Sequence, residues 1–469
     1  MIGLPRRQWI VLLLLFALSL PAVTTRIYSS DEIQYFAYLR SLWFDRDLSF
    51  ENEYQYFYSR GIAKSDGFHE TFLERQTATG RRINFATIGC AILWAPFYAA
   101  GDLVARASGA PVDGYSKPYV AAVAYGSAVY GLFAVVLSIL AARRLGLNAF
   151  LPAIAVWVGT PLLFYMYVAP PFSHACSAFG VALFIYVWLR ARDTWSPGWL
   201  AALGASAALM TMIREQDSFF AVPVALDFGL WALRGTAGAR SHSPTREVTS
   251  LVGAAVSFGI VFLPQAVAYL TLNGHLGPHS SVSHKMNWAS PHALQVLLSP
   301  EHGFLVWTPL ALVALFGVGM RLAGGRILRR LKPELDDPPR NEHLWLSIAL
   351  MVLLQVYIGG SVESWTVAGA FGQRRFVALT PILILGLAVL WNATVQAGGR
   401  PRLVWSTVIL LALYWNLAMI AEFAIGLMDR QKLEPRKNAY DAFVTLPAQA
   451  PSLAYRYLFD RASFYRGVP

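Results

Sequence analysis

The sequence predicts an all-α, polytopic integral membrane protein of the bacterial inner-membrane type, and three observations carry this prediction. Hydrophobic residues make up 56% of the 469 positions and charged residues 14%, whereas soluble domains usually carry about a quarter charged residues. Twelve apolar runs are long enough to cross about 30 Å of hydrocarbon. Short arginine-bearing loops lie between them, so the net charge of +11 is attributed to membrane topology and not to nucleic-acid binding.

The apolar runs set the expected topology. An internal N-terminus, marked by Arg6 and Arg7, and an external C-terminus require an odd number of crossings. One run is therefore re-entrant or contains two short helices, and we expect about 11–13 crossings. The main candidate for re-entrant, non-helical backbone is segment 84–105, which contains Pro96 and Asp102. The runs are 9–25, 84–105, 118–142, 148–168, 174–192, 197–213, 218–234, 248–271, 304–323, 342–360, 375–396 and 402–424.

The loops are assigned to the two sides of the membrane by their charge. An excess of arginine and lysine places the loops 235–247, 321–340 and 397–402 in the cytoplasm. We then expect residues 1–424 to form the transmembrane domain, with 26–83 as its first external loop. Residues 425–469 form a short, amphipathic external segment. The N-terminus fits a cleaved signal peptide or a retained first helix, and the lack of a clear cleavage pattern after Leu20 favours the retained helix.

The first external loop, residues 26–83, holds nine of the chain's 27 acidic residues. Ser29 and Glu32 fit a helix capping box, and apolar residues at helical spacing follow. We expect an amphipathic juxtamembrane helix on the outer interface, with Asp31 and Glu32 in its first turn. Acidic residues are favoured at helix N-termini, which is one explanation of the pair. The alternative is a general base that takes a proton from an acceptor hydroxyl as the hydroxyl oxygen attacks a sugar carbon.

An Asp31–Glu32 pair directly after the first transmembrane helix resembles the GT-C glycosyltransferase superfamily. The chain looks most like the bacterial relatives of protein O-mannosyltransferases and of lipid A aminoarabinose transferases. The stretches 84–96, 299–303 (Ser-Pro-Glu-His-Gly) and 372–376 (Gly-Gln-Arg-Arg-Phe) are similar as well. The likeness covers most of the chain as a pattern, but each motif is short.

The resemblance implies a GT-C-like bundle that moves a sugar from a polyprenyl-phosphate donor on the external face, with inversion and with a divalent cation optional. By position, Asp31 matches the family's catalytic acid and Glu32 its neighbour. Such loops often hold a second acid that assists or binds a metal. The candidates here are Glu51, Asp66, Glu70 and Glu74.

The predicted donor-phosphate site is Arg374 with Arg375, at the external end of a span. Arginine's planar guanidinium suits phosphate oxygens. The alternative is a pair that snorkels to the membrane interface, which on the external side runs against the usual charge bias. Arg214 and Asp217 lie in a polar cluster between two apolar runs. They form either a self-paired lid or a polar wall of the sugar pocket.

Further pocket candidates are Lys285 and His302 in loop 272–303, His174 at a helix start, and Trp365. His174 is alternatively a satisfied buried histidine, and Trp365 an interface anchor. The histidines of loop 272–303 are irregularly spaced and no cysteine joins them, so we expect no metal site there. Cys90 and Cys176 lie in or beside apolar segments, so neither a disulfide framework nor a Cys-based zinc site is expected.

Three functions compete. The first is an inverting glycosyltransferase whose partners are a polyprenyl-phosphate sugar, membrane lipid and an acceptor that is a glycan, a glycolipid or a protein. The second is a transporter or flippase for a lipid-linked oligosaccharide, although the paired repeats common in transporters are not evident. The third is an O-antigen ligase or polymerase, enzymes that place their principal loop late in the chain. The early acidic loop favours the transferase.

Overall fold

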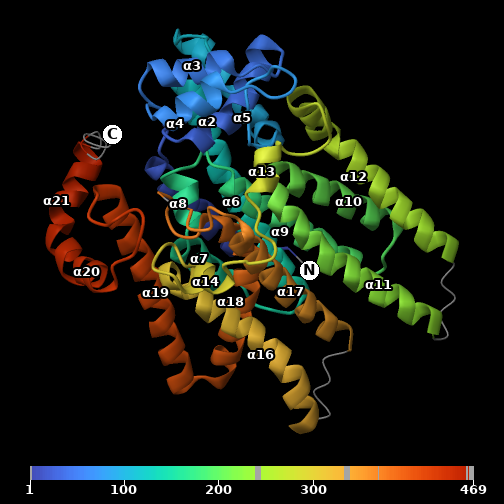
Figure 1. Cartoon of the computed structure of the whole chain (residues 1–469). Helices are drawn as coiled ribbons and strands as arrows, with labels where there is room; N and C mark the ends of the chain where they lie inside the picture. The colour runs from blue at the N-terminus through green and yellow to red at the C-terminus, as the bar shows by residue number, and fades with distance from the viewer. Residues whose placement is uncertain (1–2, 238–243, 332–338, 368, 461–462, 464–469) are drawn as a thin grey trace.

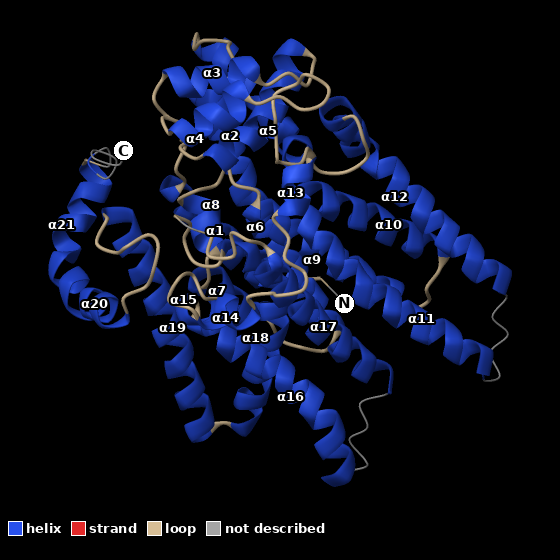
Figure 2. Ribbon diagram, viewed as in Figure 1, coloured by secondary structure: helices blue, strands red, loops and turns tan. Residues whose placement is uncertain are grey.

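The computed structural model describes residues 3–237, 244–331, 339–367, 369–460 and 463. These residues form helices joined by loops, and no extended sheet occurs among them (Figure 2). Six helical segments are long and apolar enough to cross a membrane, so the chain is a multi-pass α-helical membrane protein. They are α6 (Lys117–Arg144), α9 (His174–Ala191), α12 (Pro244–Asn273), α17 (Pro339–Ser361), η5 with α18 (Arg374–Leu379 and Thr380–Ala397) and α19 (Gly399–Ile425).

Each of the twelve predicted runs contains a helix, and the expected alternative of two short helices in one run applies to 148–168. The run 148–168 holds two short helices, α7 (Phe150–Gly159) and α8 (Leu162–Tyr167). The chain turns between them at Pro161, whose ring restricts the backbone and removes an N–H donor. The expected non-helical backbone in 84–105 is wrong, because α5 (Gly89–Ser108) continues through Pro96.

The remaining helices are not among the six candidate membrane spans. Residues 238–243 and 332–338, within two of the predicted cytoplasmic loops, lie outside the described residues. The other elements are α1 (Arg6–Ser19), η1 (Leu20–Ala22), η2 (Ser41–Asp45), α10 (Pro197–Ile213), η4 (Glu215–Phe220), α11 (Ala221–Ala237), α13 (Ser280–His284), α14 (Ala293–Leu298), α15 (Phe304–Trp307) and α16 (Pro309–Leu331).

The centre of the bundle is built from α6, α9, α10 and α18, and η5 packs directly against α9. Glycine allows the closest helix crossing, between α16 and α18. A Cβ atom on Gly317 would lie 1.9 Å from the Gly386 carbonyl oxygen, so neither helix surface has room for a side chain there. Such crossings through small residues are typical of membrane bundles. Large apolar side chains on α12 and α19, such as Ile260 and Leu410, remain exposed as expected of lipid-facing helices.

Residues 26–83, the predicted first external loop, fold into a compact helical unit at one end of the bundle (Figure 1). It comprises α2 (Ser30–Arg40), α3 (Glu51–Ser59), α4 (Asp66–Phe68) and η3 (His69–Glu74), which share a hydrophobic cluster with α5. The expectation that α2 lies on the membrane surface is wrong. Ile33 and Phe36 are fully buried, and α2 packs into this unit on most of its faces.

The C-terminal segment returns toward that same end of the bundle. After α19 the chain forms α20 (Pro435–Tyr440), η6 (Asp441–Thr445) and α21 (Leu446–Phe459), which lie beside α19 (Figure 1). Tyr455 and Phe459 on α21 are exposed and pack against each other, with ring centroids 5.1 Å apart. The exposed aromatic residues agree with the amphipathic character predicted for 425–469.

Candidate functional site

The first turn of α2 carries the acidic pair, and a capping box fixes its geometry. Glu32 N donates to Ser29 Oγ at 3.3 Å, and Glu32 Oε2 accepts from the backbone N–H groups of Tyr28 and Ser29 at 2.8 and 3.1 Å. The predicted capping box is therefore confirmed. Burial raises the pKa of Glu32 to about 8, against the lowering effect of these two hydrogen bonds. Glu32 is fully buried, so it positions the turn and is not open to substrate.

Asp31 differs from its neighbour because its side chain is 39% exposed. Its Oδ2 lies 2.8 Å from Arg374 Nη1, an ion pair that joins α2 to η5. The Arg374 guanidinium also lies over the Phe172 ring, 5.4 Å from its centroid. The predicted catalytic acid and the predicted phosphate-binding arginine, far apart in the sequence, are thus in direct contact.

Arg375 is held by a different set of contacts. Its Nη1 donates to the Ser364 carbonyl at 2.8 Å and its Nη2 to Ser364 Oγ at 3.1 Å. The Arg375 carbonyl accepts from Gln355 Nε2 at 3.0 Å and from Gln216 Nε2 at 3.5 Å. These bonds tie the start of η5 to α17, to η4 and to the loop that precedes η5, so the two arginines stand on a firmly connected backbone.

Arg214 completes a group of three guanidinium groups, which we call the arginine cluster (Arg214, Arg374 and Arg375). Arg214 hydrogen-bonds His174 Nδ1, and its Nη2 donates to Gln216 Oε1 at 3.1 Å. All three arginines lie within electrostatic reach of His174. His174 is buried and its ring nitrogen is hydrogen-bonded by Arg214. It is therefore a satisfied buried histidine that also lies beside the arginine cluster.

The self-paired lid considered for the segment 214–217 does not form in this part of the structure. Asp217 Oδ2 accepts from Ser177 Oγ at 2.6 Å, and Glu215 accepts from the Tyr269 hydroxyl. Burial raises the pKa of Asp217 to about 6, with Arg214 acting in the opposite direction. Arg214 is directed instead toward His174, so its positive charge adds to that of Arg374 and Arg375. Three cations lie close together here, and the one partly exposed carboxylate pairs with Arg374. Such a group favours an anionic ligand.

Three other predicted pocket residues have contacts elsewhere. His302 is fully buried, stacks on Trp307 and bonds the Ala370 carbonyl through Nε2 at 2.8 Å. Burial lowers its pKa, so it is a neutral structural histidine and not a pocket group. Lys285 is exposed over the Phe85 ring. Trp365 packs beside His292, with centroids 5.4 Å apart.

A second acid beside Asp31 is not identified. Glu51 pairs with Arg82, Glu74 pairs with His69, and Asp66 and Glu70 are exposed. Besides Glu32, the loop has a second buried acid, Glu53, which binds Arg40 at 3.0 Å and whose pKa burial raises to about 7. Within the described residues, no three His, Cys, Asp or Glu side chains come together as a metal site would require.

Several contacts at the site involve residues that the sequence did not single out. Ser173 Oγ donates to the Tyr35 hydroxyl at 3.0 Å, which joins α9 to α2 beside the arginine cluster. Gln355 is a polar residue inside an apolar run, and that mismatch is the signal that identifies it. Ser364 and Gln216 lie in polar loops, where nothing in the sequence distinguishes them.

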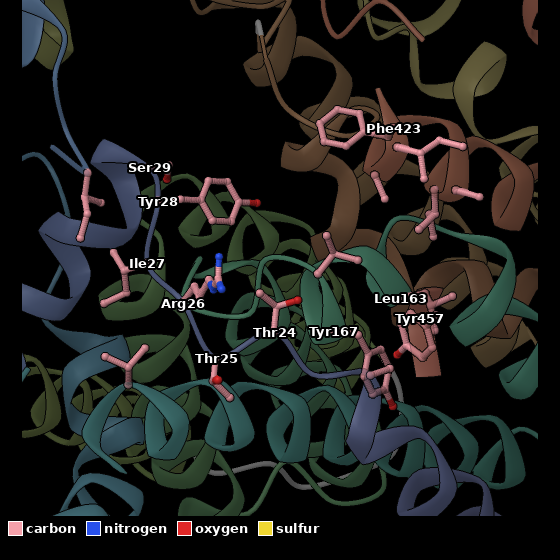
Figure 3. A pocket seen from close by; sticks show the side chains of 18 of the residues that line it. Thr24, Thr25, Arg26, Ile27, Tyr28, Ser29, Leu163, Tyr167, Phe423 and Tyr457 are labelled. Atoms are coloured by element: carbon pink, nitrogen blue, oxygen red, sulfur yellow. The ribbon is translucent and has the colours of Figure 1, made fainter. Parts of the chain in front are cut away.

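A large cavity of about 1190 Å³ adjoins the first turn of α2. Ser29 lines it, as do the linker between α1 and α2, α8, α19 and α21 (Figure 3). The first turn of α2 therefore borders this cavity and also contacts the arginine cluster through Asp31. Comparison with protein families and with curated proteins gives no significant match to this chain.

Proposed function

We propose that the protein is an inverting glycosyltransferase that moves a sugar from a polyprenyl-phosphate-linked donor to an acceptor hydroxyl on the external face of a bacterial inner membrane. The observation that carries the proposal is the contact between Asp31 and Arg374 at 2.8 Å, beside Arg214 and Arg375. A base and a phosphate-binding cation are the two groups that this reaction requires, and here they touch.

The reaction is a single displacement. The Asp31 carboxylate takes the proton of the acceptor hydroxyl while that oxygen forms a bond to the anomeric carbon. The bond from the anomeric carbon to the phosphate oxygen breaks, and the phosphate leaves with the electron pair. The arginine cluster stabilises the negative charge that develops on the phosphate. Because the acceptor enters opposite the leaving group, the configuration at the anomeric carbon inverts.

Arg374 has a double task in this scheme. Without substrate it pairs with Asp31 and fixes the carboxylate at the first turn of α2. With donor bound, its guanidinium also faces the phosphate, since five N–H donors permit contacts to two anions. Arg375, oriented by Ser364, supplies a second cation, and Arg214 a third.

The proposed bundle is GT-C-like, with about 11–13 crossings and the site on the external side. The arrangement of charge supports this orientation. The junction of α18 and α19, where Arg400 and Arg402 lie, is at the end of the bundle opposite to α2–α4 (Figure 1). The positive-inside rule counts arginine and lysine, so a basic junction at the end away from α2–α4 agrees with the proposed orientation.

The test is transfer of a radiolabelled sugar from a polyprenyl-phosphate donor by purified protein, comparing wild type with Asp31→Asn. The variant keeps the size of the side chain and removes the base, so transfer is expected to fall by about 10²–10⁴-fold while donor binding persists. Asp47→Asn, in an exposed acid of the same loop that was not a candidate catalytic acid, is the matched control and is expected to match wild type. Transfer that survives Asp31→Asn removes Asp31 from the mechanism. Donor binding without transfer to any acceptor favours carriage of the lipid-linked sugar over catalysis.

A further inference from the structure

The cavity beside α2 has the size and lining of a lipid site. Its volume of about 1190 Å³ exceeds the roughly 300–1,000 Å³ of most small-molecule sites. Its apolar wall comes from the last two turns of α19, including Leu417, Ile420 and Ala424, and from Leu453 of α21. Because α19 is a candidate membrane span, this wall lies where a lipid chain enters a protein from the bilayer.

The charged residues of the cavity are all positive. Arg26, Lys117 and Arg430 line it, and among the described residues no aspartate or glutamate does. Lys117 is the first residue of α6, and Arg430 follows the end of α19 at Ile425. Lys117 and Arg430 therefore stand at the ends of two candidate spans, and Arg26 lies in the linker that leads to α2. An apolar wall together with these cations matches one kind of occupant, an amphiphile with an anionic head.

The directions of the side chains agree with a cavity that has cations on one wall and apolar side chains on the other. Arg26 and Tyr28 extend from the linker between α1 and α2 toward the open centre, and Phe423 faces them from the opposite wall (Figure 3). Arg430 is held over the Phe423 ring, 4.8 Å from its centroid, which fixes its guanidinium at the rim.

The cavity is separate from the proposed donor-phosphate site. None of Arg214, Arg374 and Arg375 lines it. The first turn of α2 connects the two, since Ser29 lines the cavity and Asp31 contacts Arg374. A displacement with inversion needs the acceptor and the leaving phosphate on opposite sides of the anomeric carbon. Two separate cationic regions joined by the start of α2 can hold the two groups apart.

We propose that the cavity is the acceptor site, and that the acceptor is a membrane lipid whose anionic head lies against Arg26, Lys117 and Arg430 and whose chain lies along α19. This inference rests on the proposed transferase function and narrows the acceptor from a glycan, glycolipid or protein to an anionic lipid. It assigns the C-terminal helix α21 a role as one wall of the site.

Binding is tested with photoactivatable phosphatidylglycerol, which carries a diazirine in its acyl chain, in phosphatidylcholine vesicles that contain the full-length protein. Phosphatidylcholine with the same diazirine chain is the neutral comparison. Phosphatidylglycerol is expected to label peptides of α19 and α21, and the double variant Arg26→Gln/Arg430→Gln is expected to lose this labelling by about tenfold or more. Arg436→Gln, an exposed cation of the same C-terminal segment, is expected to keep it.

A second variant tests the apolar part of the cavity without changing its charge. Ala424→Trp fills the apolar part of the cavity without changing charge, so labelling of α19 is expected to fall while the melting temperature stays near that of wild type. Equal labelling by the two lipids, or labelling unchanged in the double variant, overturns the inference. Labelling of the cavity by a photoreactive polyprenyl phosphate in preference to phosphatidylglycerol also overturns it, because the cavity then holds the donor.

The acceptor role is tested by following the sugar label after incubation with the donor and a polar lipid extract of the expression host. Wild type is expected to move label into an organic-soluble anionic lipid other than the donor. Label found only in protein or in water-soluble glycan overturns the lipid acceptor but leaves the transferase. Photolabelling needs no sugar transfer, so a protein that is labelled in the cavity yet transfers nothing refutes the proposed function and not lipid binding.

Discussion

Replacing Arg374 with glutamine tests the contact on which the site depends. Arg374→Gln keeps a hydrogen-bond donor near Asp31 but removes the positive charge that faces both the carboxylate and the proposed phosphate. Two effects are expected. The carboxylate loses its ion-pair partner, and the leaving phosphate loses one of three cations.

The structure sets the size of each effect. The side chains of Asp31 and Arg374 are 39% and 22% exposed, so solvent screens the pair and its loss costs about 1 kcal/mol of stability. The effect on chemistry is larger, because removal of one group that stabilises developing charge usually costs about 10²–10³-fold in kcat. Arg374→Lys keeps the charge without the planar fork, and its rate is expected to lie between those of wild type and Arg374→Gln.

The assay is single-turnover transfer from labelled donor, with donor affinity measured separately. In the double variant Asp31→Asn/Arg374→Gln the combined loss of rate is expected to be smaller than the product of the single losses, because Arg374 also orients Asp31. Arg75→Gln, an exposed arginine of the same loop, is the control and is expected to transfer at the wild-type rate. An Arg374→Gln protein with wild-type rate and affinity, or strictly multiplicative losses, refutes the coupling.

Three further outcomes are expected. Because the folded protein holds the Glu32 proton up to a pKa of about 8, the contribution of Glu32 to stability is full below pH 4.5 and is lost as pH rises from 4.5 through 8, by at most about 5 kcal/mol. Glu32→Gln is expected to flatten this fall in melting temperature, and an equally steep fall in the variant contradicts the assignment. Arg375→Gln is expected to weaken donor binding by about tenfold or more. Ser364→Ala is expected to weaken it less, because Ser364 only orients the Arg375 guanidinium. Unchanged donor affinity in both variants argues against a contact between Arg375 and the phosphate. Gly317→Val places carbon atoms where the Gly386 carbonyl stands, so it is expected to destabilise the bundle by about 1–3 kcal/mol and to lower the melting temperature. Gly319 has open space where a Cβ atom would lie, so Gly319→Val is the control and is expected to be tolerated.

The sequence predicted the helical segments well because apolar runs of membrane length leave the backbone few alternatives. It also predicted the capping box, since Ser29 and Glu32 lie at the spacing that the motif requires. The break at Pro161 and the continuous helix through Pro96 were harder to anticipate. A proline ends one helix and is accommodated in another, and the difference is set by tertiary contacts that local sequence does not contain.

The sequence predicted that the acidic pair and the arginine pair serve one reaction, so their proximity was expected from the proposed chemistry and not from their spacing. The contact between Asp31 and Arg374 arises from packing of η5 against α9 and of α2 against α5, which no spacing rule supplies. Glutamate and histidine are common in active sites, but Glu32 and His302 are both fully buried and act in the structure. The large cavity escaped prediction because helices from both ends of the chain form its walls.

The central claim is that residue 31 lies on the external face, beside a pocket for the donor. The most direct measurement is modification of Asp31→Cys by a membrane-impermeant maleimide added to intact cells, with Arg400→Cys at the opposite end of the bundle as the control. Native Cys90 and Cys176 are buried, so they add little background. The account predicts labelling of position 31 in intact cells and of position 400 only after permeabilisation, with polyprenyl-phosphate sugar protecting position 31 in membranes. Labelling of position 31 only after permeabilisation would contradict it.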